Sequence, residues 1–222
     1  MGNQDSKIIK NYCLVNNGGV FDVKYLSDSV FKEIAYDNVR QIVRRLTKAE
    51  ILIPYDRGIY LIGKSDKSND ERITEHYLYN YGELRRGMLT GASLFYELGL
   101  IDKKPEFITI RTNKATRREK VGNLMVEPTK TVYSSGGLFP SYEISIALEL
   151  ISHRELVNDS NLSKYMELRH KYASMYTDAG MKFIANDFSG NDVVRLATLL
   201  EDMNISNRAI EINVETSHLQ NL

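Results

Sequence analysis

The sequence predicts an α+β fold, in which an N-terminal winged helix-turn-helix precedes a larger α+β domain with a small sheet and a helical C-terminal part. Three observations predict it. A strongly amphipathic helix pattern is followed at once by a hairpin pattern within the first 64 residues. A polar segment then interrupts the hydrophobic pattern over residues 64–71, and after it strand-like runs give way to helical ones. We therefore expect a DNA-binding domain over 1–64, a linker over 64–71 and a second domain over 71–222.

The first thirty residues fit two short helices. Ile8, Ile9 and Tyr12 have the spacing of a first helix, which would end near the glycines at 18 and 19. Residues 22–26 fit a second helix, because Asp22 is a residue type that accepts hydrogen bonds from the free N–H groups at a helix start.

The stretch 34–61 is the most informative part of the chain. It contains apolar residues at i, i+3, i+4 and i+7, which form one stripe along a helix: Val39, Ile42, Val43 and Leu46. The outer face carries amides and cations, the groups that contact phosphates and base edges. These polar residues are Asn38, Arg40, Gln41, Arg44, Arg45 and Lys48.

Two short β-branched runs follow this helix and join at Asp56-Arg57-Gly58, which predicts a hairpin. A helix with this outer face and a small basic hairpin suit a winged helix-turn-helix. We expect the helix to lie in the major groove, and Tyr55 and Arg57 of the hairpin to reach the phosphate backbone or minor groove. The simpler alternative is an ordinary amphipathic helix whose solvated face is basic.

The segment 64–71 is polar and without hydrophobic residues, so it is the best linker candidate. Beyond it the sequence predicts helices over 71–82 and 84–98, and strands over 107–111, 123–126 and 130–133. Further helices are expected over 142–156, 162–176 and 193–203.

A second basic segment, residues 111–120, has five cations and one acid between two predicted strands. Its cations are Arg111, Lys114, Arg117, Arg118 and Lys120. They would form either an exposed loop that grips phosphates or a solvated hairpin connection. We include them among the candidate DNA contacts.

Composition sets broader limits. The chain has 222 residues and equal numbers of basic and acidic side chains, 29 of each. Residues 1–64 carry ten Lys and Arg against seven Asp and Glu, while residues 151–222 carry seven against ten. Cys13 is the only cysteine, so an intrachain disulfide is excluded. Without a signal-like or membrane-spanning run, the sequence predicts a cytoplasmic protein with no membrane partner.

The sequence offers little catalytic chemistry. The histidines, His76, His153, His170 and His218, are scattered and lack metal-ligand spacing. No dinucleotide-binding or P-loop glycine motif follows a predicted strand. We therefore expect no catalytic residue, no metal and no cofactor, and predict that the protein is not an enzyme. A DNA-processing enzyme with a winged-helix targeting domain has little residue-level support.

Two segments together carry a resemblance to a known family. Arg57-Gly58-Ile59-Tyr60 resembles the wing of AbiEi-type antitoxins, which belong to type IV toxin–antitoxin systems of bacterial abortive infection. Leu89 to Leu100 is similar to the small-residue helix of that family, which ends in Gly-Leu and is followed by a proline and a strand, here over 105–112. The resemblance covers roughly residues 5–150.

The resemblance implies an antitoxin that also binds double-stranded promoter DNA and represses its own operon. Its partner would be a nucleotidyltransferase-like toxin encoded next door, and the second domain would be needed for antitoxicity. The alternative is a stand-alone winged-helix transcriptional regulator whose second domain senses a ligand or makes an oligomer. An adjacent toxin-like gene would favour the first, and an isolated gene the second.

Overall fold

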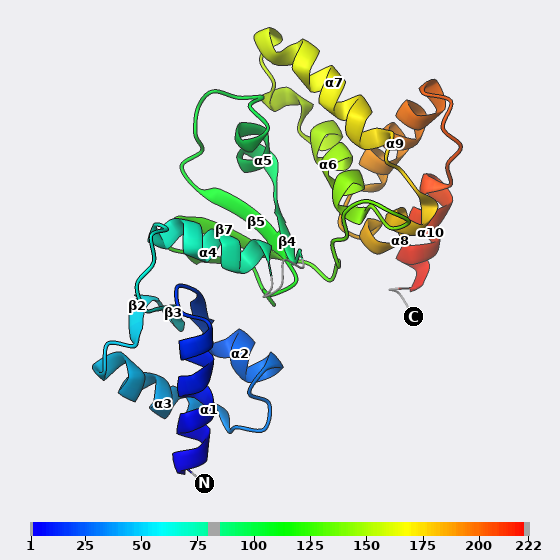
Figure 1. Ribbon diagram of the computed structural model, residues 1–222. Helices are drawn as coiled ribbons and strands as arrows, with labels where there is room; N and C mark the ends of the chain where they lie inside the picture. Colours follow the sequence, from blue (N-terminus) through cyan, green and yellow to red (C-terminus); the bar gives the residue numbers. More distant parts are fainter. Residues whose placement is uncertain (1, 80–84, 220–222) are drawn as a thin grey trace. The chain divides into compact units, whose positions relative to one another are not determined.

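The computed structural model describes residues 2–79 and 85–219 (Figure 1). The chain forms two compact units. The first contains Met1–Tyr77 and Lys120–Leu124, and the second contains Leu78–Glu119 and Met125–Leu222. Each unit is described by itself below.

The first unit holds three helices, a small sheet and almost all of a fourth helix. In chain order these elements are α1 (Gly2–Val15), β1 (Val20–Asp22), α2 (Val23–Ser29), α3 (Tyr36–Lys48), β2 (Leu52–Asp56), β3 (Ile59–Ile62) and α4 (Asn69–Leu78). The strands are antiparallel in the order β1-β3-β2, with Val20 opposite Leu61 and Leu52 opposite Ile62. The three helices and the hairpin predicted before residue 62 are thus confirmed as elements.

Local chemistry explains the starts and faces of these helices. Asp22 caps α2, because its side chain accepts a hydrogen bond from the backbone N–H of Tyr25 at 3.0 Å. The predicted apolar stripe of α3 is buried: Val39, Ile42, Val43 and Leu46. It packs in one core with side chains from α1, α2 and the sheet, including Ile9, Phe21 and Leu26. Burial of this stripe turns the opposite face of α3 to solvent.

The boundary between the units differs from the predicted linker over 64–71. The loop after β3 ends at a capping box, in which the Ser68 N–H donates to the Glu71 carboxylate at 2.7 Å and the Glu71 N–H donates to Ser68 Oγ at 3.3 Å. The helix α4 that starts there belongs to the first unit. Its Ile73 and Tyr77 are almost fully buried.

Arg72 explains why α4 belongs to the first unit. Its side chain is buried and donates to four backbone carbonyls of that unit, at 2.8–3.3 Å: Gly18, Gly19, Ile62 and Gly63. The division therefore follows Tyr77. A fragment that begins near residue 70 would contain a helix whose packing partners are missing.

The second unit combines a four-stranded sheet with helices. Its strand order is β4-β5-β7-β6, and the turn between β6 and β7 is counted with the first unit. The elements are β4 (Gly87–Leu89), α5 (Gly91–Glu97), β5 (Ile108–Thr112), β6 (Glu119–Val121), β7 (Leu124–Pro128), α6 (Ser141–Ser152), α7 (Leu162–Ala173), α8 (Asp178–Ile184), α9 (Gly190–Asp202) and α10 (Ala209–Leu219), with short 3-10 turns at Arg154–Leu156 and Asp159–Asn161.

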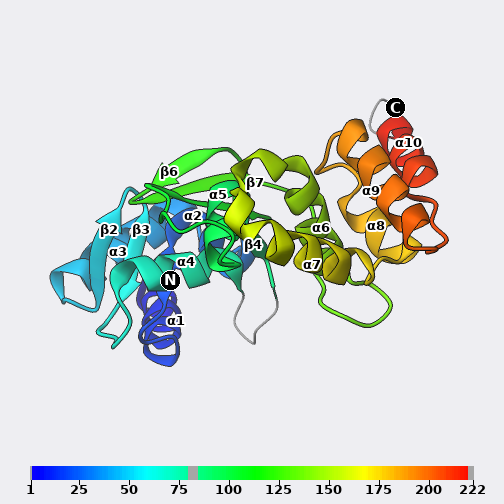
Figure 2. The same cartoon turned by 90° about the horizontal axis from the view of Figure 1, so that it is seen from above.

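Two apolar clusters form the core of this unit. One joins α5 and β4 to α6 and α7, with Phe95, Met88 and Leu150 buried. The other joins α6 to α8, α9 and α10, with Leu148, Leu196 and Ile212 buried. Figure 2 shows α8, α9 and α10 gathered at the C-terminal end of the chain. The helix α6 is buried on most sides because it belongs to both clusters.

Several predictions for the second unit need correction. The helix expected over 84–98 is instead a strand, β4, followed by α5. Leu89 of β4 pairs with Ile110 of β5, and Gly91 at the start of α5 has φ 51°. Residues 130–133 do not form a strand. Thr131 there donates its hydroxyl to the Phe183 carbonyl and the Asp187 carboxylate. The sequence also missed β6, α8 and α10.

Other predicted elements are present with shifted ends. The helix expected over 71–82 is α4, which ends at Leu78, and residues 80–84 lie outside the described part of the chain. The strands over 107–111 and 123–126 are β5 and β7, and the three later helices are α6, α7 and α9. Among the described residues, no helix combines the length and apolar composition needed to cross a bilayer.

Candidate nucleic-acid interface

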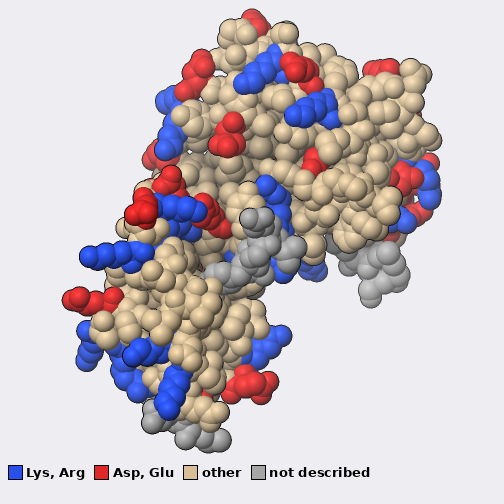
Figure 3. All heavy atoms as spheres, in the orientation of Figure 1, with Lys and Arg blue, Asp and Glu red and all other residues tan. Residues whose placement is uncertain are grey.

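The outer face of α3 is the strongest candidate surface. All six polar residues predicted there are exposed: Asn38, Arg40, Gln41, Arg44, Arg45 and Lys48. They face solvent because the apolar stripe on the other side of α3 is buried in the core of the first unit. Figure 3 shows basic side chains gathered over the α3 region of that unit.

Most of this face is not engaged by other side chains. Arg40 is the exception: its guanidinium lies 3.8 Å from the Asp37 carboxylate and 5.9 Å from the centre of the Tyr36 ring. That ion pair is solvent-exposed, and such pairs contribute roughly 0–1 kcal/mol, so it can be exchanged for a phosphate. Within the described residues, the side chains of Gln41, Arg44 and Arg45 form no hydrogen bond or ion pair. Their donors are available to a ligand.

The hairpin tip adds an exposed cation. Arg57 lies in the turn between β2 and β3, where its backbone N–H donates to Asp56 Oδ1 at 2.6 Å. The next residue has φ 80°, a left-handed conformation that glycine adopts without a steric penalty, and Gly58 occupies it. The turn therefore presents the Arg57 side chain to solvent.

Tyr55 has a structural role that the sequence did not predict. Its hydroxyl donates to Asp70 Oδ1 at 2.8 Å, and it lies against the β6–β7 turn, where a Cβ on Gly122 would be 2.2 Å from the Tyr55 hydroxyl oxygen. Burial and the Asp70 carboxylate raise the pKa of Tyr55 to about 12. Its hydroxyl is already committed within the first unit, so we remove Tyr55 from the candidate DNA contacts.

Two further hydrogen bonds join the same turn to the rest of the first unit. Gly122 N–H donates to Asp56 Oδ2 at 2.8 Å, and the Asn123 amide donates to Asp70 Oδ2 at 2.9 Å. Lys120 is exposed at the start of this segment and therefore belongs to the same unit as α3 and the hairpin. Among the cations of the 111–120 segment, Lys120 is the one that belongs to the unit containing α3.

Two cations of that segment do not lie in an exposed loop, contrary to the prediction: Arg111 is half-buried and Lys114 is buried. Arg111 lies 3.3 Å from the Glu149 carboxylate and 5.2 Å from the centre of the Phe188 ring. Lys114 is buried and donates its ammonium group to the Tyr79 carbonyl. Arg111 lies in β5 and Lys114 follows it, and both are held by partners within the second unit. Neither is accessible to a phosphate backbone.

The remaining two cations of the segment are exposed. Arg117 lies 3.5 Å from Glu119, and Arg118 lies 3.1 Å from Glu127, with the arginine side chains 78% and 68% exposed. These surface ion pairs are weak enough to be replaced by contacts to an external anion. The role of Arg117 and Arg118 in DNA binding stays a prediction.

The histidines occupy separate environments. His76 is 3.7 Å from Asp22, His153 lies between Glu149 and Glu155, and His170 contacts the Met166 carbonyl. In the described ranges, no three His, Cys, Asp or Glu side chains are grouped in a way that could hold a metal ion. Cys13 is buried, which raises the pKa of its thiol to about 11.

Comparisons with known proteins give no family assignment. No family model matches the chain, and no curated protein sequence matches it. Three solved chains match by structure. One is the crystal structure of the RV2827C protein from Mycobacterium tuberculosis, with 14% identity and a TM-score of 0.41, covering 88% of this chain and 76% of that one.

Proposed function

We propose that the first unit is a winged helix-turn-helix domain that binds double-stranded promoter DNA, with α3 as the recognition helix and the β2–β3 hairpin as the wing. The observation that carries the proposal is the outer face of α3, where the side chains of Gln41, Arg44 and Arg45 are exposed and without a partner among the described residues, opposite a buried apolar stripe. Gln41 and Arg45 have the donor chemistry that reads base edges in the major groove. Arg57 and Lys120 would contact phosphates.

Substitutions on α3 test this proposal through their effect on specificity. We expect Gln41→Ala or Arg45→Ala to cost about 1–3 kcal/mol on the specific site if the residue reads a base, with a smaller loss on unrelated DNA. Fluorescence anisotropy with a duplex from the gene's own upstream region, and with a scrambled duplex, measures both losses. The double variant Lys103→Ala and Lys104→Ala, at exposed positions of the second unit, controls for bulk charge. Unchanged affinity in both α3 variants would remove this helix from the interface.

We further propose that the chain acts as an antitoxin of a type IV toxin–antitoxin system, represses its own operon and counters a nucleotidyltransferase-like toxin. The support is the resemblance to AbiEi-type antitoxins. Its two motifs fall on defined elements here: Arg57-Gly58-Ile59-Tyr60 spans the hairpin turn and β3, and Gly91–Glu97 is α5, which is followed by Gly99 at φ 63°. We assign antitoxicity to the second unit.

Full-length variants test the antitoxin role better than fragments, because the β6–β7 turn and α4 belong to the first unit. Cells would express the neighbouring toxin together with the wild-type chain or with the double variant Arg44→Gln and Arg45→Gln. We expect both to restore growth, while only the wild type represses a reporter fused to the promoter. Failure of the wild-type chain to restore growth would refute the antitoxin role and leave DNA binding to be judged separately.

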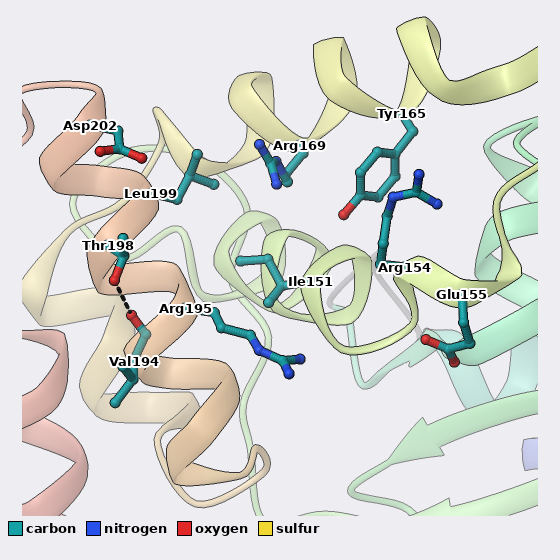
Figure 4. A pocket seen from close by; sticks show the side chains of 10 residues that line it. All are labelled: Ile151, Arg154, Glu155, Tyr165, Arg169, Val194, Arg195, Thr198, Leu199 and Asp202. Carbon is teal, nitrogen blue, oxygen red and sulfur yellow. Dashed lines mark hydrogen bonds between the residues drawn. The ribbon is translucent and has the colours of Figure 1, made fainter. Parts of the chain in front are cut away.

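A stand-alone transcriptional regulator with a ligand-sensing second domain is the second candidate. One observation favours it: the second unit contains an open pocket lined by three arginines (Figure 4). If the protein is such a regulator, a small molecule should change the DNA affinity of the full-length chain, and no toxin gene should lie beside its gene.

A further inference from the structure

A pocket of about 640 Å³ lies in the helical part of the second unit. It is lined by residues from α6, the Arg154–Leu156 turn, α7 and α9, among them Ile151, Arg154, Tyr165, Arg169, Arg195 and Leu199. Figure 4 shows the three arginines entering this space from three different elements around Ile151. The volume is in the range of sites that hold small organic ligands.

Two arginines of this pocket, Arg154 and Arg169, are held in place without an ion pair to any described residue. Arg154 and Arg169 lie 5.2 and 5.7 Å from the centre of the same Tyr165 ring, whose hydroxyl is fixed by a bond to the Leu150 carbonyl at 3.1 Å. Arg154 also donates to the Val157 carbonyl. Within the described residues, neither arginine forms an ion pair. Two guanidinium groups are thus placed against one aromatic ring with their charges unpaired.

One further donor beside this pocket has no partner within the described part of the protein. The Nε atom of Arg169 is buried and has no hydrogen-bond partner among the described residues. A buried charged donor without a partner is costly, so native sites usually satisfy it. The third arginine, Arg195, has only a 3.7 Å contact with Asp192 and is 65% exposed. All three can therefore turn donors toward a common anion.

The geometry points to a small phosphorylated ligand of the nucleoside diphosphate class. Guanidinium forks match the oxygens of phosphate groups and bind them through paired N–H donors. The apolar side chains of Ile151 and Leu199 offer a surface for a base or another flat apolar group. The carboxylates of Glu155 and Asp202, which form no ion pair with the three arginines, are acceptors for hydroxyl groups of a sugar. We infer that the pocket binds such a molecule, whether or not the first unit binds DNA.

Calorimetric titration of the full-length chain with ADP tests this inference, and inorganic pyrophosphate tests the phosphate part alone. We expect saturable ADP binding with a submillimolar Kd, weakened at least tenfold by Arg169→Gln and by Arg154→Gln. Pyrophosphate is expected to bind the wild type more weakly than ADP and to lose affinity in the same variants. If ADP and pyrophosphate bound with comparable affinity, the phosphate site would be supported and the nucleoside would contribute little to binding.

Two controls keep the test decisive. Arg208 is exposed, directly precedes α10 and pairs with Glu215 of that helix. Arg208→Gln should leave the Kd for ADP within twofold of the wild-type value. Arg195→Gln alters a largely exposed side chain, so it should fold normally and weaken ADP binding even if the Arg169 variant is unstable. Absence of saturable binding for both probes, or an equal loss in the Arg208 variant, would overturn the inference. Saturable binding of an RNA oligonucleotide with no binding of either probe would also overturn it.

Discussion

Replacing Arg72 with methionine should destabilise the first unit strongly. Arg72 is 5% exposed and crosslinks two segments that are about 45 residues apart, the loop before β1 and the end of β3, through four carbonyls. Methionine keeps much of the apolar stem but removes every donor. The carbonyls of Gly18 and Gly63 would then lose their hydrogen-bond partner.

The magnitude follows from which carbonyls keep a partner. The Ile62 carbonyl still accepts from Gly18 N–H at 2.8 Å, and the Gly19 carbonyl still accepts from Ile62 N–H at 2.9 Å. The carbonyls of Gly18 and Gly63 have no other donor within the described residues. At about 1–3 kcal/mol for each acceptor left unsatisfied, these two carbonyls give about 2–6 kcal/mol. Both bonds are only part-buried, so we expect a loss in the lower half of that range, about 3–4 kcal/mol in the free energy of opening of this unit. Burial lowers the pKa of Arg72, but the side chain stays charged at neutral pH.

Hydrogen exchange measured by mass spectrometry reports this loss unit by unit, which a single melting temperature of a two-unit chain does not. Peptides that cover β1 and β3 should exchange about a hundred- to a thousandfold faster in Arg72→Met. Peptides from α9 and α10 should not change. In Arg72→Lys, the exchange rates of the β1 and β3 peptides should lie between those of wild type and Arg72→Met, because an ammonium group keeps the charge but lacks the fork of donors.

Lys67→Met is the matched control. Lys67 pairs with Glu75 of α4 at 2.6 Å, but both side chains are about half exposed, so the expected loss is below about 1 kcal/mol. If Arg72→Met changed the exchange of β1 and β3 no more than this control, Arg72 would not hold α4 to the first unit. The assignment of residues 69–77 to that unit would then lose its physical reason.

Three further predictions concern single contacts. The pKa of Tyr55 is about 12 in the folded protein and 10.0 in an unfolded chain, so the free energy of unfolding should fall as pH rises through this window. Tyr55→Phe should make this fall smaller, as measured by urea titrations followed by circular dichroism. Gly122→Ala should lower the melting temperature more than Gly136→Ala, because both glycines have positive φ but only the first would clash with Tyr55. Arg111→Met should cost about 1–3 kcal/mol, because it removes the cation beside the buried Glu149 carboxylate, which keeps its hydrogen bond from the Gly91 N–H. Adding Glu149→Gln should recover part of that loss in the same titrations.

Each of these has a clear contrary result. Parallel pH profiles for wild type and Tyr55→Phe would mean that the Tyr55 proton is not held by folding. Equal melting temperatures for the two glycine variants would mean that the β6–β7 turn is not packed on Tyr55. A double variant no more stable than Arg111→Met would show that Glu149 is not the partner whose charge matters.

The first sixty residues were largely predictable because their signals are local. The stripe from Val39 to Leu46, the Asp22 cap and the turn at Gly58 each depend on neighbours in the sequence. The exposed face of α3 follows from the same periodicity, so its six polar residues could be predicted as one surface.

The rest depends on contacts between distant residues. The sequence around Arg72 predicts a helix but does not mark Arg72 as buried. The carbonyls that accept from it, Gly18 and Gly19, lie more than fifty residues away in the sequence. Arg111 and Lys114 belong to a charged run, yet their partners come from residues 149 and 79. The pocket arginines are spread over 42 residues and share no motif, so only the packing of α6, α7 and α9 brings them together.

The salt dependence of DNA binding tests the central proposal most directly. Each phosphate contact that is lost should flatten the plot of log affinity against log salt by about 0.9 on duplex DNA. For the triple variant Arg44→Gln, Arg45→Gln and Lys48→Gln we predict a slope flatter than wild type by about 2, because Arg44 and Lys48 flank the base-reading Arg45 and would contact phosphates. For Lys103→Gln with Lys104→Gln we predict an unchanged slope. Equal slopes for wild type and the α3 variant would contradict the account and leave α3 as an ordinary solvated helix.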